Sequence, residues 1–563
     1  MKVVICQINS KYIHSSLAAW CLRAGVKAYC KTAPSVSVVE GTINEAPDTV
    51  IERLTEKHPD IIGFCCYIWN ITYLKALAKR VKELLPECRM VFGGPEVSYN
   101  AESVLLECDF LDYVICGEGE YPFAYLADCI QKGKEPENCG ICYKKEGSAI
   151  ISEPYISADE PPSPYCDEYF DTLGGRMVYF ETSRGCPYRC AFCLSGRCGG
   201  VRYFDINRIK SEILMLAASK TQTIKFVDRT FNANKRRAKE IIRFVIQHYG
   251  NQIPENLCFH FEIAGDILDQ ELLKLLSGAP KGLFQLEIGM QSFNAETLSH
   301  INRKTDCELL KRNIIMLTQA RNMHIHIDLI AGLPMENLES FKESFNTAYS
   351  LKANMLQLGF LKLLHGADMR EDAEKFPCTF SELPPYEVID TPHISKEEIL
   401  LLKKIEDVVE RTYNSGRFTE TLNYLEGLGF TPFDIFAKIS EGLGEGYRLS
   451  LDEYGRQLFA VISAFEGVDS ARLRDIMLCD RMRSVADGKI PDFLRIEDEF
   501  LKTAKHFLEK TKSYKRPEGI KRAVALLYSE RSVVWCDYDL PDRVTGHYTL
   551  NKLPFDKIVK YCD

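Results

Sequence analysis

The stretch Ser183-Arg-Gly-Cys186-Pro-Tyr-Arg-Cys190-Ala-Phe-Cys193 places three cysteines in one short loop, with spacings of three and then two residues. The apolar run Met177-Val-Tyr-Phe180 before it predicts a buried strand, so the loop would lie at the carboxyl end of that strand. Active sites of βα barrels are built at this end. A cubane 4Fe-4S cluster has four irons, so three thiolates leave one iron without a protein ligand. Such an open site indicates chemistry rather than structural cross-linking.

A zinc knuckle is the plainer interpretation of these cysteines, with Cys198 as a fourth ligand. Structural zinc sites use paired cysteine clips and a closed shell of four ligands. Here the three cysteines are followed by the glycine-rich segment 196–200, which does not form a second clip of that kind. The spacing therefore favours an iron–sulfur cluster.

Cys186, Cys190 and Cys193, with Phe192 before the last of them, resemble the signature of the radical S-adenosylmethionine (SAM) superfamily. The resemblance implies that the three cysteines hold a 4Fe-4S cluster and that the amine and carboxylate of SAM chelate the fourth iron. It also implies that Phe192 lies beside the adenine. We therefore expect an enzyme of this class, with the three cysteines as its catalytic and metal-binding residues.

The composition is that of an ordinary globular protein with several domains. The chain has 563 residues, of which 46% are hydrophobic and 26% charged, and this length predicts roughly three to four domains. The net charge of −9 argues against a general nucleic-acid surface, and no apolar run reaches the length of a membrane-spanning helix. The sequence begins as a strand with no cleavable signal, and its 22 cysteines then favour a reducing cytoplasm.

Strand-like and helix-like stretches alternate through the first 130 residues. Such units predict an open, doubly wound parallel sheet, in which ligands bind at the carboxyl ends of the strands. Periodicity alone permits a flavodoxin, a response regulator or a nucleotide-binding domain. The loops at these strand ends are polar or glycine-rich, and they include Gly93, Gly94, Glu96, Gly117 and Glu118.

A domain of this type directly ahead of the cysteine loop resembles the cobalamin-binding domain of cobalamin-dependent radical SAM enzymes. The resemblance implies a flavodoxin-like fold in which the nucleotide tail of cobalamin enters the sheet edge while the corrin faces the barrel. It makes the five strand-end residues above candidates for binding cobalamin. Glycine suits such loops because a large planar ligand needs close approach of the backbone.

The cobalt ligand of many cobalamin proteins has no match in this sequence. Those proteins carry Asp-x-His-x-x-Gly after the first strand, and this chain has Asn9-Ser-Lys-Tyr-Ile-His14-Ser-Ser instead. A histidine at a helix start is favoured to make local hydrogen bonds. We therefore expect cobalamin to bind without a histidine on its lower face, and loss of cobalamin binding is the rival outcome.

A second βα series, from about Met177 to Gly366, predicts a partial (βα)6 barrel that is open on one side. Polar residues follow its apolar strands, where side chains would point into the barrel top. One acid at such a place could be a helix cap, but five polar residues in register indicate a binding site. These residues are Asp228, Glu262, Glu287, Gln291 and Asp328.

The radical SAM resemblance implies roles for these residues and their neighbours, all as SAM-binding candidates. Asp228 and Asn232 would bind the amino group of SAM. Glu262, Glu287 and Gln291 would hold its ribose and carboxylate, and the turn from Ile330 through Gly332 to Pro334 would lie beside adenine. Several acids around a sulfonium cation are also electrostatically favourable.

The chain is expected to divide into a cobalamin-binding domain (1–140), a linker (141–174), a radical SAM core (175–390) and a mainly helical C-terminal domain (391–563). Ser395 and Glu398 form a capping-box pattern at the start of a long amphipathic helix that reaches roughly Tyr413. The C-terminal part resembles a domain of unknown function found behind such cores. A helical cap over the barrel and a substrate-binding role are both open.

The resemblance implies a reaction in which reduction of SAM gives a 5′-deoxyadenosyl radical, which removes hydrogen from an unactivated carbon before methylcobalamin delivers a methyl group. The leading hypothesis is a cobalamin-dependent radical SAM C-methyltransferase of a small or medium metabolite, with flavodoxin or ferredoxin as electron donor. The same cofactors could instead serve a rearrangement, cyclisation or oxidation. A cobalamin-binding carrier or sensor with only a structural cluster is a third hypothesis. No motif identifies the substrate or the pathway.

Overall fold

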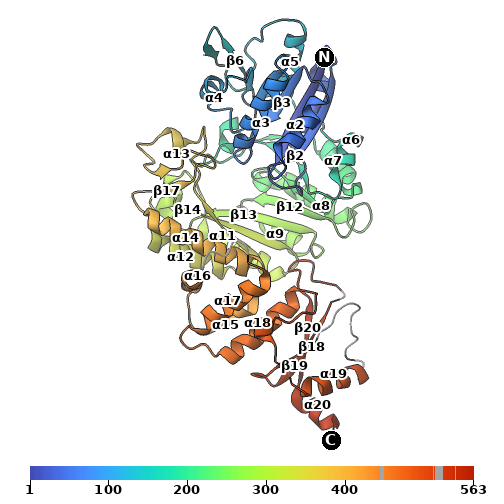
Figure 1. Cartoon of the computed structure of the whole chain (residues 1–563), viewed down its shortest axis with the longest axis vertical. Coiled ribbons are helices and arrows are strands. Elements are labelled where there is room, and N and C mark those ends of the chain that lie inside the picture. The colour runs from blue at the N-terminus through green and yellow to red at the C-terminus, as the bar shows by residue number, and fades with distance from the viewer. Residues whose placement is uncertain (444–448, 497, 512, 514–523, 539, 563) are drawn as a thin grey trace. The chain divides into compact units, whose positions relative to one another are not determined.

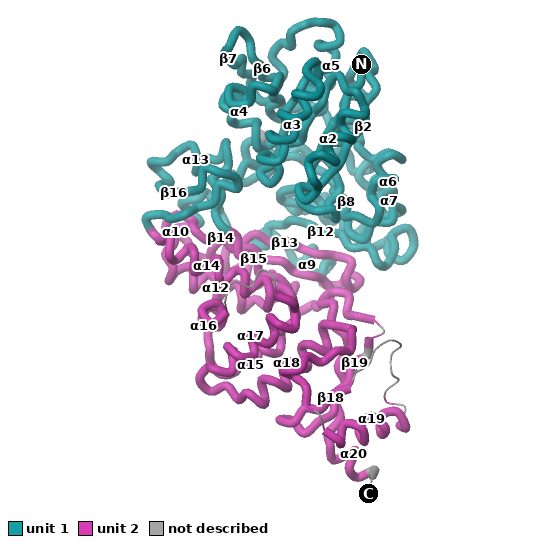
Figure 2. Tube along the Cα trace, viewed as in Figure 1, with its two compact units in different colours: residues 1–276, 298–305, 360–392 teal, residues 277–297, 306–359, 393–563 magenta. Residues whose placement is uncertain are grey.

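The structure of the chain is a computed structural model (Figure 1). It describes residues 1–443, 449–496, 498–511, 513, 524–538 and 540–562. The chain divides into two compact units (Figure 2). Unit 1 comprises residues 1–276, 298–305 and 360–392, and unit 2 comprises residues 277–297, 306–359 and 393–563.

Unit 1 begins with five parallel strands that alternate with helices, as the sequence predicts. The strands are β1 (Lys2–Asn9), β2 (Ser35–Thr42), β3 (Ile61–Cys65), β4 (Arg89–Gly93) and β5 (Tyr113–Ile115). The helices are α1 (Leu17–Tyr29), α2 (Pro47–Thr55), α3 (Ile71–Leu84), α4 (Ala101–Glu107) and α5 (Glu120–Gln131). The strand order is β2-β1-β3-β4-β5.

The sheet is covered by helices on both faces. Helices α2, α3 and α4 bury one core around Phe64 and Phe92, and α1 and α5 bury the other around Phe123 and Ile115. Because apolar side chains leave each strand alternately toward the two faces, a strand covered on both sides is almost continuously apolar. The predicted doubly wound sheet is confirmed.

Residues 141–174, predicted to be a linker, contain regular structure that belongs to this sheet. Strands β6 (Ile141–Lys145) and β7 (Ser148–Ile150) extend it beyond β5 as antiparallel strands. Ile141 is buried in one core and Cys142 in the other, which accounts for the pairing of β6. Helix α6 (Asp167–Leu173) then precedes the next strand series.

The six strands predicted for the barrel are present and alternate with helices. In unit 1, β8 (Val178–Phe180), β11 (Thr223–Phe226) and β12 (Cys258–Ile263) are parallel neighbours in that order. In unit 2, β13 (Phe284–Gln291), β14 (His324–Ala331) and β15 (Met355–Phe360) follow in order. The intervening helices include α7 (Ile206–Ala218), α8 (Lys235–His248), α9 (Gln270–Ser277), α11 (Cys307–Ala320) and α12 (Leu338–Ser350).

The C-terminal part of unit 2 is mainly helical, as predicted. Helix α14 (Lys396–Val409) begins at the predicted capping box, in which Ser395 accepts a hydrogen bond from the backbone of Glu398 and donates its own backbone N–H to the Glu398 carboxylate. The other described helices include α15 (Thr419–Gly427), α16 (Pro432–Gly442), α17 (Leu451–Ser463), α18 (Ser470–Ser484), α19 (Phe500–Lys510) and α20 (Phe555–Cys562). An antiparallel sheet follows, with β18 (Val524–Leu527), β19 (Ser532–Asp537) and β20 (Thr549–Pro554).

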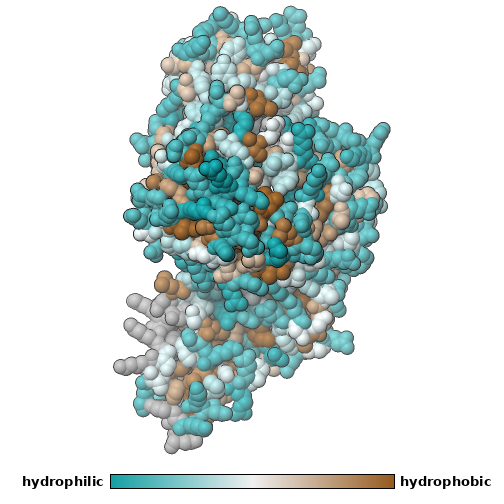
Figure 3. All heavy atoms as spheres, turned by 180° about the vertical axis from the view of Figure 1, so that it is seen from behind, coloured by the Kyte–Doolittle hydropathy of each residue, from teal (hydrophilic) through white to brown (hydrophobic). Residues whose placement is uncertain are grey.

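The molecular face in Figure 3 is mostly hydrophilic, and its hydrophobic side chains lie in small groups. Within the described ranges, no helix is both long and apolar enough to cross a membrane.

Candidate functional site

The cysteine loop follows β8 directly, at the carboxyl end of that strand. Strand β9 (Ser183–Arg184) pairs antiparallel with β10 (Arg202–Tyr203), so the two ends of the loop are held together. The cysteine side chains of the loop that the structure describes are free thiols. The side chain of Cys198, the alternative zinc ligand, lies outside the described residues.

The three thiols lie near one another but have different surroundings. Burial raises the pKa of Cys190, the thiols of Cys193 and Cys186 raise it further, and the guanidinium of Arg303 lowers it. Three free thiols in one irregular loop fit the ligand set of an iron–sulfur cluster. Each thiol has its own partner: the Thr230 hydroxyl lies 3.4 Å from Cys186, the Ser195 backbone N–H 3.4 Å from Cys193, and the Arg303 guanidinium 3.8 Å from Cys190.

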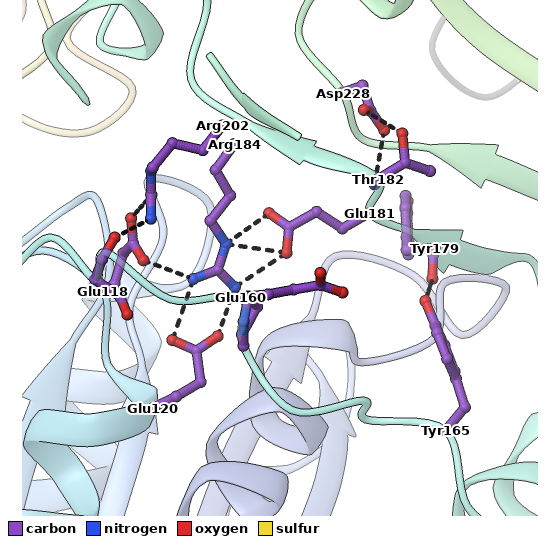
Figure 4. Close-up of polar contacts among 12 residues, drawn as sticks. Glu118, Glu120, Glu160, Tyr165, Tyr179, Glu181, Thr182, Arg184, Arg202 and Asp228 are labelled. Atoms are coloured by element: carbon purple, nitrogen blue, oxygen red, sulfur yellow. Dashed lines mark hydrogen bonds and ion pairs between the residues drawn. The ribbon is translucent and has the colours of Figure 1, made fainter. Parts of the chain in front are cut away.

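Arg184, at the end of β9, lies at the centre of an ion-pair network (Figure 4). Its Nη2 lies 2.5 Å from Glu120 Oε1, its Nη1 3.0 Å from Glu118 Oε2, and its Nε 3.0 Å from Glu181 Oε1. Glu118 also pairs with Arg202 of β10. Burial alone would raise the pKa of Glu120, but Arg184 outweighs burial and the pKa lies below its ordinary value. The network ties the loop between β5 and α5 to both strands that close the cysteine loop.

A cavity of about 660 Å³ lies within unit 1. The carboxyl ends of the parallel strands form one side of it, which is where doubly wound sheets bind ligands. Strands β8, β11 and β12 supply other lining residues. From the first domain the lining includes Asn9, His14, Cys65, Tyr67, Trp69, Gly93, Gly94, Gly117 and Glu118, and from the strand series Tyr179, Glu181, Arg184, Lys225, Arg229 and Glu262.

Two aromatic rings present a flat surface to this cavity. Tyr67 and Trp69 are stacked, with ring centroids 4.3 Å apart and planes 7° from parallel. Trp69 is 46% exposed, and both residues line the cavity. A large planar ligand with amide and phosphate groups fits a space with such a wall, two glycine loops and several charged side chains.

The glycines of the cavity wall are required by the fold itself. Gly94 and Gly117 have φ angles of 119° and 87°, in the region that favours glycine. A Cβ atom on Gly94 would lie 2.4 Å from the carbonyl oxygen of Cys66, and one on Gly117 would lie 2.2 Å from that of Tyr155. The sequence predicts close approach to a ligand, whereas the structure shows close approach to neighbouring backbone at both positions.

Glu96 is not among the residues that line the cavity, although its neighbours Gly93 and Gly94 are. Its buried carboxylate accepts a hydrogen bond from the hydroxyl of Tyr386. Burial raises the pKa of Glu96, and this hydrogen bond opposes the rise. The contact ties the loop after β4 to the segment 360–392, and the predicted contact of Glu96 with a cofactor stays a prediction.

His14 lines the cavity, and its ring contacts strand β8 rather than its own turn. Its Nδ1 lies 2.8 Å from the hydroxyl of Tyr179 in β8. Burial and nearby lysines lower the pKa of His14, which favours the neutral imidazole. The local hydrogen bond expected for this ring is therefore replaced by a long-range one, and the absence of a histidine ligand to cobalt stays a prediction.

Asp228 and Asn232 lie after β11 as predicted, with side chains bonded to neighbouring loops. The Asp228 carboxylate accepts hydrogen bonds from the backbone and hydroxyl of Thr182 at 3.1 and 2.7 Å, and from the Ser183 hydroxyl. The Asn232 amide donates to the carbonyl of Ala264 at 2.7 Å and accepts its N–H at 2.9 Å. Both residues fix the loops beside the cysteines, and their contact with SAM stays a prediction.

Three side chains of unit 2 meet at β13 and β14. Candidate ligand atoms of Glu287, His326 and Asp328 lie within 4.8 Å of one another. Glu287 is paired with His326 in the strand register, and Nε2 of His326 lies 3.0 Å from Oδ1 of Asp328. The sequence pattern indicates the two acids but not His326. His326 lies two positions before Asp328, so the two side chains leave the strand on the same face. This alternation could have indicated His326 as a third member of the group.

The carboxyl ends of β13 and β14 are irregular. Gln291 has a φ of 71° and lies at a register shift, a feature that redirects a side chain at a strand end. Half-buried Ile330 is followed by the turn at Gly332, whose φ is 83°. Beyond this turn Glu336 is buried, and its carboxylate accepts hydrogen bonds from the hydroxyls of Ser292 and Ser344 at 2.5 and 3.2 Å.

Several lining residues were missed by the sequence analysis. Lys225 lies 4.0 Å from the predicted residue Glu262 across β11 and β12. A lysine inside the apolar run Thr223–Phe226 was a signal that one face of this strand meets a polar space. Tyr179 in β8 and Trp69 after β3 carried no such signal, because aromatic residues are common in buried elements.

Three family models match successive parts of the chain. The model described as B12 binding domain matches residues 4–127. The model of the Radical SAM superfamily matches residues 180–348. The model described as protein of unknown function (DUF4080) matches residues 374–531. These matches agree with the resemblance to cobalamin-binding radical SAM enzymes that carry a C-terminal domain of unknown function, and the predicted domain bounds stay a prediction.

Curated relatives are similar to parts of the chain. The uncharacterized methyltransferase PH0819 of Pyrococcus horikoshii is 31% identical over 37% of this chain and 48% of its own. The cobalamin-dependent radical SAM methyltransferase TokK of Streptomyces tokunonensis is 27% identical over 54% of this chain and 46% of its own. The chain thus spans about half the length of these curated relatives.

A solved structure extends the likeness to most of the fold. The cobalamin-dependent SAM radical enzyme OxsB, with aqua-cobalamin and SAM bound, aligns with 92% of this chain and 82% of its own at a TM-score of 0.59 and 15% identity. At this identity the likeness concerns the fold alone. It confirms the α/β architecture predicted from the sequence.

Proposed function

We propose that this chain, parts of which match the models of the Radical SAM superfamily and the B12 binding domain, is a cobalamin-dependent radical SAM enzyme that methylates an unactivated carbon of a small or medium metabolite. The observation that carries the proposal is the cavity of unit 1, where loops of the B12 binding domain and strands of the radical SAM core line one space. When bound, the cluster and cobalamin would supply the radical chemistry and the methyl group.

The cysteine loop would hold the cluster, with Cys186, Cys190 and Cys193 as thiolate ligands. Cys190 is only 8% exposed, and such burial keeps water away from a reduced metal site. Arg184 holds the loop against Glu118 and Glu120 of the B12 binding domain. These ion pairs thereby fix the cysteine loop relative to the wall of the cavity.

Cobalamin would bind in the cavity, beside the strand-end loops that contain Gly93, Gly94 and Gly117. The exposed face of Trp69 would support the planar corrin. Glu262, Lys225 and the other polar residues of the barrel strands line the opposite side of the cavity. We retain the SAM contacts implied for Phe192, Asp228, Asn232, Glu262, Glu287, Gln291, Asp328, Ile330 and Gly332 as part of the proposal.

The partners and the location are also proposals. A small reduced flavodoxin or ferredoxin would supply electrons to the cluster. The net charge of −9 argues against nucleic acid as a substrate. The cysteines described with their side chains are free thiols, which supports a reducing compartment such as the cytoplasm.

Product analysis tests the proposal. The full chain, reconstituted anaerobically with iron, sulfide and hydroxocobalamin, is incubated with SAM, a reductant and candidate metabolites. Methyl transfer predicts both 5′-deoxyadenosine and S-adenosylhomocysteine, with a product mass one methylene higher. Deoxyadenosine and a converted substrate without S-adenosylhomocysteine would indicate a non-methylating reaction, and the absence of both nucleosides would indicate a carrier. A Cys190→Ala variant should form neither product.

A further inference from the structure

The thiol of Cys190 differs from those of Cys186 and Cys193 in the charge of its partner. Arg303 directs its Nη1 toward the Cys190 sulfur at 3.8 Å. The other two thiols meet a hydroxyl and a backbone N–H, which are neutral. Hydrogen bonds that involve a charged donor are stronger than neutral ones. One cluster ligand is therefore placed beside a permanent positive charge, since an arginine side chain stays protonated.

Backbone hydrogen bonds on both sides of Asn302 hold Arg303 beside the cysteine loop. The N–H of Ala191, next to Cys190, donates to the carbonyl of Ile301 at 2.9 Å. Asn302 then adopts a φ of 57°, in the left-handed region that asparagine tolerates better than most residues. The N–H of Arg303 donates to the carbonyl of Leu298 at 2.8 Å. The guanidinium thus extends from a turn that is anchored to the cysteine loop itself.

We propose that Arg303 is a positioning residue that holds the Cys190 thiolate and raises the reduction potential of the cluster bound by this loop. The inference rests on the proposed cluster site and goes beyond it by assigning a function to a residue outside the cysteine motif. Arg303 does not contact the reacting atoms in this account. It acts through the sulfur of Cys190.

The physical reason is that reduction adds one negative charge to the cluster. Hydrogen bonds to the sulfurs, net charge and solvent exposure set the potential of an iron–sulfur cluster. A cation near a thiolate ligand stabilises the reduced form more than the oxidised form, and it does so strongly where water is excluded. Removal of the charge should therefore make the cluster harder to reduce. We expect the equilibrium constant for one-electron reduction to fall about tenfold, which corresponds to about 59 mV.

The experiment is a potentiometric titration of the full chain, followed by electron paramagnetic resonance of the reduced cluster. Iron and sulfide contents and the circular dichroism spectrum are recorded for every sample. Arg303→Gln removes the charge, and Arg303→Lys keeps a cation while losing the planar fork. Lys304→Gln is the matched control, because it removes one charge from the next residue, which is exposed. We expect a lower potential in Arg303→Gln, a smaller shift in Arg303→Lys and the wild-type value in Lys304→Gln.

The outcomes separate this inference from the proposed function. A fully loaded Arg303→Gln variant with the wild-type potential would overturn the inference alone. If folded Arg303→Gln holds no cluster, loading of Arg303→Lys supports the inference, because the cation is then the feature required. Failure of Arg303→Lys to load, while Lys304→Gln loads normally, overturns it and leaves Arg303 as a residue of the loop fold. A wild-type chain without any cluster would contradict both the inference and the proposed function.

Discussion

Arg184 donates to Glu120 at 2.5 Å, and the two residues are 64 positions apart in the sequence. Both side chains are largely buried, with 14% and 9% exposed. Arg184→Gln would leave Glu118, Glu120 and Glu181 close together without their shared cation. Breaking a buried pair in this way costs on the order of 3 kcal/mol. We predict a clearly lower melting temperature of unit 1 in the full chain, measured by calorimetry, and weaker binding of hydroxocobalamin.

The control for this variant is Arg80→Gln. Arg80 pairs with Asp48 at 2.5 Å, but the two side chains are 52% and 69% exposed. Exposed ion pairs contribute about 0–1 kcal/mol. Equal losses of stability in the two variants would refute a special role for the Arg184 network.

Gly117→Ala should damage the cavity wall far more than Gly147→Ala. Both glycines have positive φ, 87° and 81°, so both substitutions cost about 1 kcal/mol of backbone strain. Only at Gly117 would the added Cβ meet another atom, the Tyr155 carbonyl oxygen at 2.2 Å, whereas nothing lies within 4 Å at Gly147. We predict that Gly117→Ala loses cobalamin affinity and that Gly147→Ala keeps it, as read from equilibrium dialysis. Comparable affinities would mean that the cavity wall accommodates the shift.

Glu336 should make the stability of unit 2 depend on pH. Burial raises the pKa of this carboxyl from 4.5 to about 7, although the hydroxyls of Ser292 and Ser344 oppose the rise. Well below pH 4.5 the Glu336 carboxyl is protonated in both the folded and the unfolded chain, so its full contribution to the free energy of unfolding is present. It is lost as pH rises through about 7, because the unfolded chain releases its proton first.

Glu336→Gln cannot ionise and should be spared this loss. The shift corresponds to a difference on the order of 3 kcal/mol at pH 8 and about 0.8 kcal/mol at pH 5. Thermal unfolding of both chains at these two pH values measures it. Asp480, whose pKa burial also raises to about 7, is present in both chains and cancels in the comparison. A pH-independent difference between the chains would contradict the prediction.

His14→Ala should leave the lower face of bound cobalt unchanged. His14 is engaged by the Tyr179 hydroxyl at 2.8 Å through Nδ1, and the sequence lacks the motif that presents a histidine to cobalt. We predict that cob(II)alamin bound to the wild-type chain shows no nitrogen hyperfine splitting from a protein histidine. Splitting in the wild type that disappears in His14→Ala would identify His14 as the ligand.

The fold could be predicted from sequence wherever local periodicity and burial agree. The five parallel strands of the first domain and the capping box at Ser395 follow from alternation of apolar residues and from local hydrogen bonds. Strands β6 and β7 could not be placed in the sheet, because antiparallel addition at an edge depends on long-range pairing. Helix α18 also escaped prediction, since Arg474, Asp475 and Asp480 are buried among its apolar residues.

The residues of the candidate site also differ in how far the sequence alone predicts them. The cysteine loop was recognised because its ligands are close in sequence. The partners that position it were not, because Glu120 and Arg303 come from distant segments. Asp228 was selected from its place after a strand and Asn232 from the resemblance to radical SAM enzymes. The structure adds hydrogen bonds to Thr182 and Ala264 that no local pattern encodes. Sequence spacing thus identifies metal ligands more readily than the residues that hold them.

We expect one chain to hold both a cubane cluster at the cysteine loop and cobalamin in the cavity of unit 1. The most direct test is the content of iron, sulfide, zinc and cobalt in the full chain after anaerobic reconstitution and removal of unbound metal. We predict about four iron and four sulfide per chain, about one cobalamin, and loss of the iron and sulfide but not of the cobalamin in Cys190→Ala. Stoichiometric zinc in place of iron, or a chain that retains no cobalamin, would contradict the claim.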